Sequence, residues 1–117
     1  MATIVDSYSE TNKSQVNGFG SPTFQGYGQS FTGDGGTLNS SKFYLEKREL
    51  PTGNIVSKVY AHSGTFGTSS VPTGSALATS DNVDVSTLGL LALVTFTFSG
   101  ANKITLTNGT KYVVTVE

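Results

Sequence analysis

The sequence predicts an all-β protein: an antiparallel β-sandwich of jelly-roll or Greek-key type, with about seven or eight short strands and no substantial helix. The first observation is residues 90–98, the most apolar stretch, which alternates with the period of a strand. Its wholly apolar face consists of Ala92, Val94, Phe96 and Phe98. The second is turn residues at roughly 10-residue spacing, and the third is the absence of any helix-period segment. We expect residues 90–98 to form the central strand.

The composition indicates one ordered domain with a hydroxyl-rich surface. The chain has 117 residues, which is enough for a single domain, residues 1–117. Charged residues make up only 13%, about half the usual share, and Ser, Thr, Gly and Asn replace them. Seven Phe and five Tyr supply material for a core.

Charge and cysteine content exclude several classes of function. The net charge of −1 gives no basis for nucleic-acid binding. The chain has no cysteine, so it can form neither disulfides nor thiolate metal sites. No stretch approaches a membrane span, and the first residues do not resemble a secretory signal, so we expect no membrane insertion.

The amino-terminal half contains the predicted first strands. We expect a short strand at Ala2–Tyr8, a long Gly- and Ser-rich loop to Tyr27, and a second strand at Gly28–Thr32 closed by a turn over residues 33–36. Residues 37–48 and 54–62 alternate on either side of a Pro-Thr-Gly turn signal. They are therefore predicted to pair as a hairpin.

The carboxyl-terminal half adds short strands. Candidates lie at residues 75–79 and 82–85, and residues 86–89 could form a single helical turn before the 90–98 strand. Near the end, Asn108-Gly109 separates residues 104–107 from the last strand, 110–117. A two-residue hairpin there would place the apolar residues of its two strands on opposite faces, so we expect a bulge or an arch between the sheets.

Catalytic chemistry is poorly represented in the sequence. His62 stands at the end of a strand on its polar face, where a partly exposed structural residue is the simpler interpretation. Glu46 and Glu49 suggest a glycosidase pair, but a solvated hairpin end explains them better. We therefore expect a protein that is not an enzyme and has no cofactor.

Two kinds of ligand stay open. Asp34, Asp81 and Asp84 lie in turn-like segments whose oxygens could hold calcium, although such turns also occur without metal. Aromatic residues on glycine-rich loops could instead stack on sugar rings or simply cap the sandwich. These candidate glycan-binding residues are Phe19, Phe24, Tyr27 and Phe66.

Several segments together resemble a known family. They are residues 28–33, 38–45, 51–54, 59–64 and 108–112. Over most of the chain from about residue 26, they resemble the β-sandwich "choice-of-anchor" domains of bacterial surface proteins and related phage and metagenomic virion proteins. The resemblance implies a sandwich fold and a location on a virion or at a cell surface, and it transfers no catalytic or binding residue.

The resemblance also raises an expectation about assembly. Such domains usually continue past the last strand of this chain, so residues 28–117 could lack carboxyl-terminal strands. An uncovered strand edge is a template for pairing with another chain, although the long Ser9–Tyr27 segment could instead supply the missing cover. We therefore expect a structural or display module that forms a homo-oligomer or a larger assembly through Tyr112, Val114 and Val116, with carbohydrate binding as the alternative function.

Overall fold

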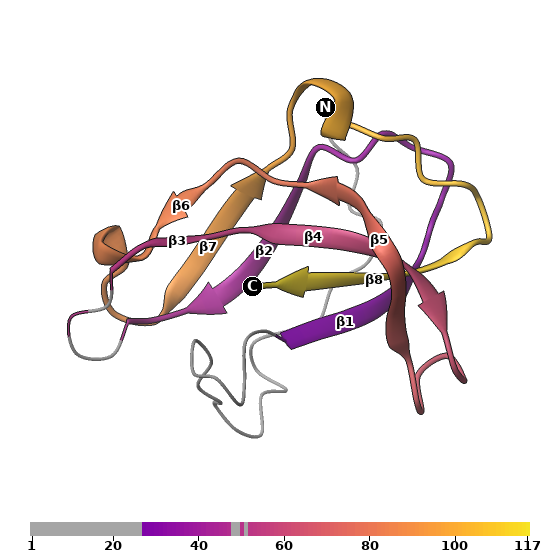
Figure 1. Cartoon of the computed structure of the whole chain (residues 1–117), viewed down its shortest axis with the longest axis horizontal. Coiled ribbons are helices and arrows are strands. Elements are labelled where there is room, and N and C mark those ends of the chain that lie inside the picture. The colour runs from indigo at the N-terminus through magenta and orange to yellow at the C-terminus, as the bar shows by residue number, and fades with distance from the viewer. Residues whose placement is uncertain (1–26, 48–49, 51) are drawn as a thin grey trace.

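The computed structural model describes residues 27–47, 50 and 52–117, and within them the protein is all-β (Figure 1). The strands are β1 (Tyr27–Thr32), β2 (Ser40–Leu45), β3 (Asn54–Ile55), β4 (Ser57–Ser63), β5 (Val71–Thr79), β6 (Val83–Asp84), β7 (Ala92–Thr97) and β8 (Lys111–Val116). Two single turns of 3₁₀ helix, η2 (Val85–Thr87) and η3 (Gly100–Asn102), interrupt them. The predicted Ala2–Tyr8 strand and most of the loop that follows it lie outside the described residues.

The strands pair in a nested antiparallel order. The first described strand pairs with the last, β1 with β8, and the series continues inward with β2–β7, β3–β6 and β4–β5. A further ladder joins β4 to β8, which makes a four-stranded sheet of order β1-β8-β4-β5. Nested pairing of this kind is what folding one long hairpin over itself would produce, and the described strands form the predicted antiparallel β-sandwich.

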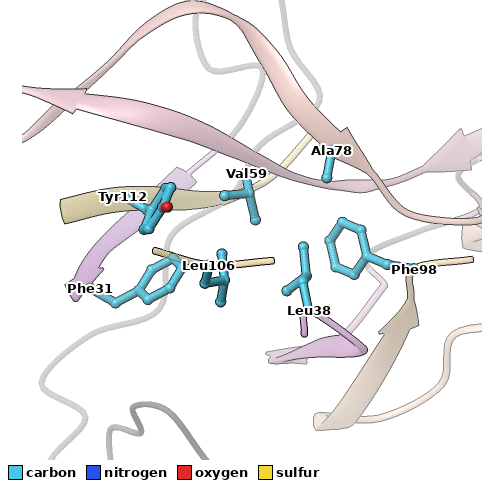
Figure 2. Packing of buried hydrophobic residues seen from close by; sticks show 7 residues of the cluster. All are labelled: Phe31, Leu38, Val59, Ala78, Phe98, Leu106 and Tyr112. Atoms are coloured by element: carbon cyan, nitrogen blue, oxygen red, sulfur yellow. The ribbon is translucent and has the colours of Figure 1, made fainter. Parts of the chain in front are cut away.

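The core lies between the four-stranded sheet and the β2–β7 pair, in two clusters of apolar side chains. Figure 2 shows the first cluster, in which side chains from both layers point toward one another. Its members are Phe31, Leu38, Val59, Ala78, Phe98, Leu106 and Tyr112. The second cluster contains Ile55, Phe96 and Val116. Phe43 and Leu45 of β2 pack against it, so the smaller sheet closes the sandwich over β8.

The alternation in residues 90–98 correctly predicted which face of this strand is buried, but the prediction that the strand is central in its sheet is wrong. Phe96 and Phe98 are fully buried while Leu93, on the other face, is about half exposed. However, among the described strands β7 pairs only with β2. The two central strands of the four-stranded sheet are β8 and β4. The apolar pattern of residues 90–98 therefore identified the buried face of the strand but not the strands that pair with it.

The predicted hairpin between residues 37–48 and 54–62 is wrong. β2 pairs with β7, and β4 pairs with β5 and β8. Phe43 on β2 and Val59 on β4 reach the core from opposite layers, so the chain crosses from one sheet to the other between them. Both strands carry an apolar face, and the alternation alone does not say which sheet each face belongs to.

The carboxyl-terminal arch is confirmed. Residues 104–107 do not pair with β8; they run beside residues 36–38, where Leu38 N donates to Ile104 O and Leu106 N donates to Gly36 O. Gly33 makes this crossing possible, because a Cβ there would stand 2.5 Å from Thr107 O and 2.9 Å from the Tyr112 ring. The Tyr112 hydroxyl accepts a hydrogen bond from Thr107 N at 2.8 Å and fixes the arch to β8.

The predicted assembly edge is wrong in its location. Tyr112, Val114 and Val116 lie on β8, which is hydrogen-bonded to β1 on one side and to β4 on the other. Their side chains face the core. A strand with both edges paired offers no free ladder to another chain.

Candidate functional site

A groove of about 580 Å³ lies on the four-stranded sheet, on the face away from the core. Its described lining combines backbone and side chains of β1, β8, β4 and β5 with the loop between β4 and β5. The lining residues are Tyr27, Gly28, Gln29, Ser30, Tyr60, Gly67, Thr68, Ser70, Pro72, Gly74, Val113, Thr115 and Glu117. The described lining therefore combines residues with hydroxyl, amide and carboxylate groups with two tyrosines.

The floor of the groove follows from strand register. Because Phe31, Tyr112 and Val116 point into the core, the alternate residues of β1 and β8 point outward. Gly28 is paired with Thr115, and Ser30 with Val113. A Cβ on Gly28 would lie only 3.1 Å from the side chains of both Thr115 and Val113, so glycine keeps the floor open at this point.

One wall of the groove is the loop at the end of the β4–β5 hairpin, residues 64–70. Gly64 begins it with a φ of +82°, in the left-handed region that favours glycine. Backbone N–H groups of Thr68 and Ser69 donate to Thr65 O at 3.0 and 2.9 Å. The Ser70 hydroxyl accepts from Gly67 N at 3.0 Å and lies 2.8 Å from His62 Nε2, so the loop is internally fixed and tied to β4.

A cation–π contact holds this wall against β8. The Phe66 ring lies 5.6 Å from the His62 ring, centroid to centroid, and Lys111 Nζ stands 4.5 Å from the centroid of Phe66. Lys111 Nζ also donates to the Thr32 hydroxyl at 2.8 Å. A contact of this type at an exposed site is worth about 0.5–1 kcal/mol. Phe66 therefore anchors the loop, and it is not among the groove-lining residues.

The other end of the groove carries a polar network around Glu117. Tyr60 and Thr115 hydroxyls both donate to Glu117 Oε2 at 2.7 Å, and Lys58 Nζ lies 3.4 Å from Oε1. Burial, the hydrogen bond to Glu117 and its negative charge together raise the pKa of Tyr60 to about 12. Burial alone would raise the pKa of Glu117, but hydrogen bonds from Thr115 and Tyr60 and the charge of Lys58 outweigh it and lower that pKa.

The structure separates the four predicted glycan-binding aromatics. Tyr27 begins β1 and lines the groove, with 37% of its surface exposed. Phe66 anchors the loop that forms the wall and does not line the groove. Phe19 and Phe24 lie outside the described residues. The sequence interpretation missed Tyr60, whose place on the polar face of residues 54–62 was visible, although its contact with Glu117 was not.

Each of the three candidate calcium-binding carboxylates accepts a hydrogen bond from another residue of the chain. Asp34 Oδ1 accepts from Gly36 N, and Asp81 Oδ1 accepts from the Ser99 hydroxyl. Asp84 accepts from the backbone N–H and the hydroxyl of Ser86 and caps η2, and these hydrogen bonds lower its pKa. In the part of the chain that the structure describes, no three His, Cys, Asp or Glu side chains come together as a metal site.

Within the described residues, no helix is long and apolar enough to cross a membrane. Comparisons of the chain with protein-family models, with curated proteins and with solved structures found no match. The groove and its chemistry are therefore the basis on which a function is proposed.

Proposed function

We propose that the protein is a non-catalytic display module, carried on a virion or at a cell surface, that binds carbohydrate in the groove on its four-stranded sheet. The observation that carries the proposal is the groove lining itself. Its described residues include Tyr27, Tyr60 and Gln29 together with four residues that carry hydroxyl groups, namely Ser30, Thr68, Ser70 and Thr115. Sugar rings present apolar faces and many hydroxyls, and this combination complements both.

The proportion of polar residues in the groove lining favours a sugar over an apolar ligand. Ligand pockets for apolar molecules are lined mainly by hydrophobic side chains with few polar groups. Among the described lining residues, Val113, Pro72 and the two tyrosines have the larger apolar side chains, and residues with hydroxyl, amide or carboxylate groups and glycines make up the rest. Pairs of aromatic rings gain about 0.5–1.5 kcal/mol beyond the area that they bury, and we expect a comparable gain for a tyrosine ring against the apolar face of a sugar.

The display setting has separate support. The resemblance to choice-of-anchor domains implies a position on a virion or at a cell surface, and the low-charge, hydroxyl-rich composition suits such a position. Assembly into a larger body is part of this proposal on the same grounds. Self-assembly through the edges of β8 is not part of the proposal, because β1 and β4 cover both of them.

Affinity electrophoresis through gels containing soluble polysaccharides tests the proposal. The protein should be retarded by at least one polysaccharide, and Tyr27→Ala should weaken that interaction roughly tenfold, about 1.4 kcal/mol. Tyr44→Ala is the matched control, because Tyr44 is similarly exposed, at 44%, but lies on β2 in the other sheet. Absence of retardation across a broad panel, or equal losses from both substitutions, would contradict binding in the groove.

A further inference from the structure

Glu117 dominates the electrostatics of the groove. It is the only charged side chain among the described lining residues, and about a third of its side chain is exposed. Its neighbour Lys58 does not line the groove, and it directs its ammonium group at Glu117 Oε1 over 3.4 Å. The groove therefore has a carboxylate at this end, and the Lys58 ammonium behind it offsets part of its negative charge.

The hydroxyl protons beside Glu117 are already committed. A tyrosine or threonine hydroxyl has one proton to donate and keeps lone pairs that accept. Tyr60 and Thr115 both donate to Glu117 Oε2 at 2.7 Å, a length typical of strong charge-assisted bonds. The other acceptor within reach of Thr115, Lys58 O, is farther away at 3.5 Å. Toward a ligand, these two hydroxyls offer only lone pairs.

The three side chains thus form an acceptor-only end of the groove. A carboxylate has about four lone-pair sites, of which two on Oε2 are used by the hydroxyls and one on Oε1 faces Lys58. The carboxylate also stays ionised at neutral pH, since its hydrogen bonds lower the pKa of Glu117. A ligand group at this end must bring a proton to donate.

We infer that the groove selects uncharged, hydroxyl-rich glycans and rejects acidic ones, with Glu117 as the specificity-determining residue. This inference rests on the proposed carbohydrate binding. Sugar hydroxyls can donate to the acceptors at Glu117, Tyr60 and Thr115. The carboxylates and sulfates of acidic sugars have no proton to donate at neutral pH, and they meet like charge, which is costly where water is displaced.

The test uses pairs of polysaccharides that share a backbone and differ in charge. Binding to hydroxyethyl cellulose is compared with carboxymethyl cellulose, and binding to dextran with dextran sulfate, at physiological salt. In at least one pair we expect the neutral polymer to bind the native protein roughly tenfold more tightly or better, about 1.4 kcal/mol. Glu117→Gln should reduce this ratio to about threefold or less, because the amide removes the charge and adds a donor. Asp34→Asn makes the same charge change outside the groove and should leave the ratio unaltered.

The outcomes separate the two proposals. If no polymer of either charge binds, the proposed function fails and the inference falls with it. If the native protein binds the neutral and acidic members of a pair equally, carbohydrate binding stands and the inference is overturned without any variant. An unchanged ratio in Glu117→Gln, with folding verified by circular dichroism, would also overturn it, since the discrimination would then arise elsewhere.

Discussion

At the scale of single residues, the Tyr60–Glu117 pair links the structure to a measurable property. The phenol donates to the carboxylate at 2.7 Å, and its ionisation would place a second negative charge beside the first. Burial, this hydrogen bond and the negative charge all act against the phenolate, which raises the pKa of Tyr60 from 10.0 to about 12. A shift of this kind is also a statement about stability.

We predict that the Tyr60 phenol ionises only as the pH rises to about 12. Because the folded-state pKa is raised, the contribution to stability is complete below pH 10 and is lost as the pH rises through about 12. The tyrosinate absorbance should lose its highest-pH component in Tyr60→Phe and keep it in Tyr44→Phe. Between pH 10 and 12 the free energy of unfolding should also fall more steeply in the native protein than in Tyr60→Phe. Survival of the late component in Tyr60→Phe would show that another tyrosine carries it.

At the scale of elements, the β4–β5 hairpin is the part whose position decides whether a groove exists. Its end projects beyond the neighbouring strands (Figure 1), and Val71 at the start of β5 is half exposed. Residues 64–69 are exposed, so the position of this end depends on the Phe66–Lys111 contact and on the hydrogen bonds of residues 64–70. Segments of this kind open at lower free energy than the core.

We predict that Lys111→Met loosens the hairpin loop without unfolding the protein. The substitution keeps a long apolar stem but removes the charge over the Phe66 ring and the hydrogen bond to Thr32. Amide hydrogen exchange of Thr65, Gly67, Thr68 and Ser69 should accelerate about two- to fivefold, as the loss of about 0.5–1 kcal/mol implies. Global stability should change little. Lys103→Met, near η3, is the control, and comparable acceleration in that variant would refute a specific role for Lys111.

At the scale of the whole molecule, the sequence predicted the class of fold better than its connections. Alternation assigned the buried faces of β7 and the turn chemistry located most strand ends. The conflict of register around Asn108-Gly109 correctly indicated an arch. These signals are local, because each depends on residues that are close together in the sequence.

The wrongly predicted strand pairs and the unpredicted groove have one cause, which also concerns the whole molecule. Which strand pairs with which depends on closing the sandwich around both clusters, and the partners are far apart in sequence: Tyr27 pairs with Val116, and Ser40 with Thr97. The alternation of β2 and β4 suits a hairpin as well as the two separate ladders that form. The groove was invisible for the same reason, since its floor and the Tyr60–Glu117 contact arise only when β8 enters between β1 and β4. Among the described lining residues, Tyr27 was predicted from the sequence as a ligand-binding aromatic, because an aromatic residue among glycines is a local signal.

The two apolar clusters provide the last prediction, which concerns cooperativity. They are connected by continuous segments of chain. β8 contributes Tyr112 to the first cluster and Val116 to the second, and Phe98, directly after β7, belongs to the first while Phe96 of β7 belongs to the second. Neither cluster can come apart without displacing a strand that belongs to both. We therefore expect one cooperative unit, as is usual for single domains of this size.

Leu106→Ala in the first cluster and Ile55→Ala in the second should each lower the free energy of unfolding by about 2–5 kcal/mol, because each empties a buried site. Urea denaturation should give a single transition in both variants, with the slope of the native protein. Leu90→Ala is the control: this leucine is 89% exposed, so its truncation should change stability by no more than about 0.5 kcal/mol. A second transition in either core variant would mean that one cluster melts independently and that β8 does not couple the two. A single shifted transition in both would show that the strand forming the floor of the groove is also the strand that makes the sandwich one folding unit.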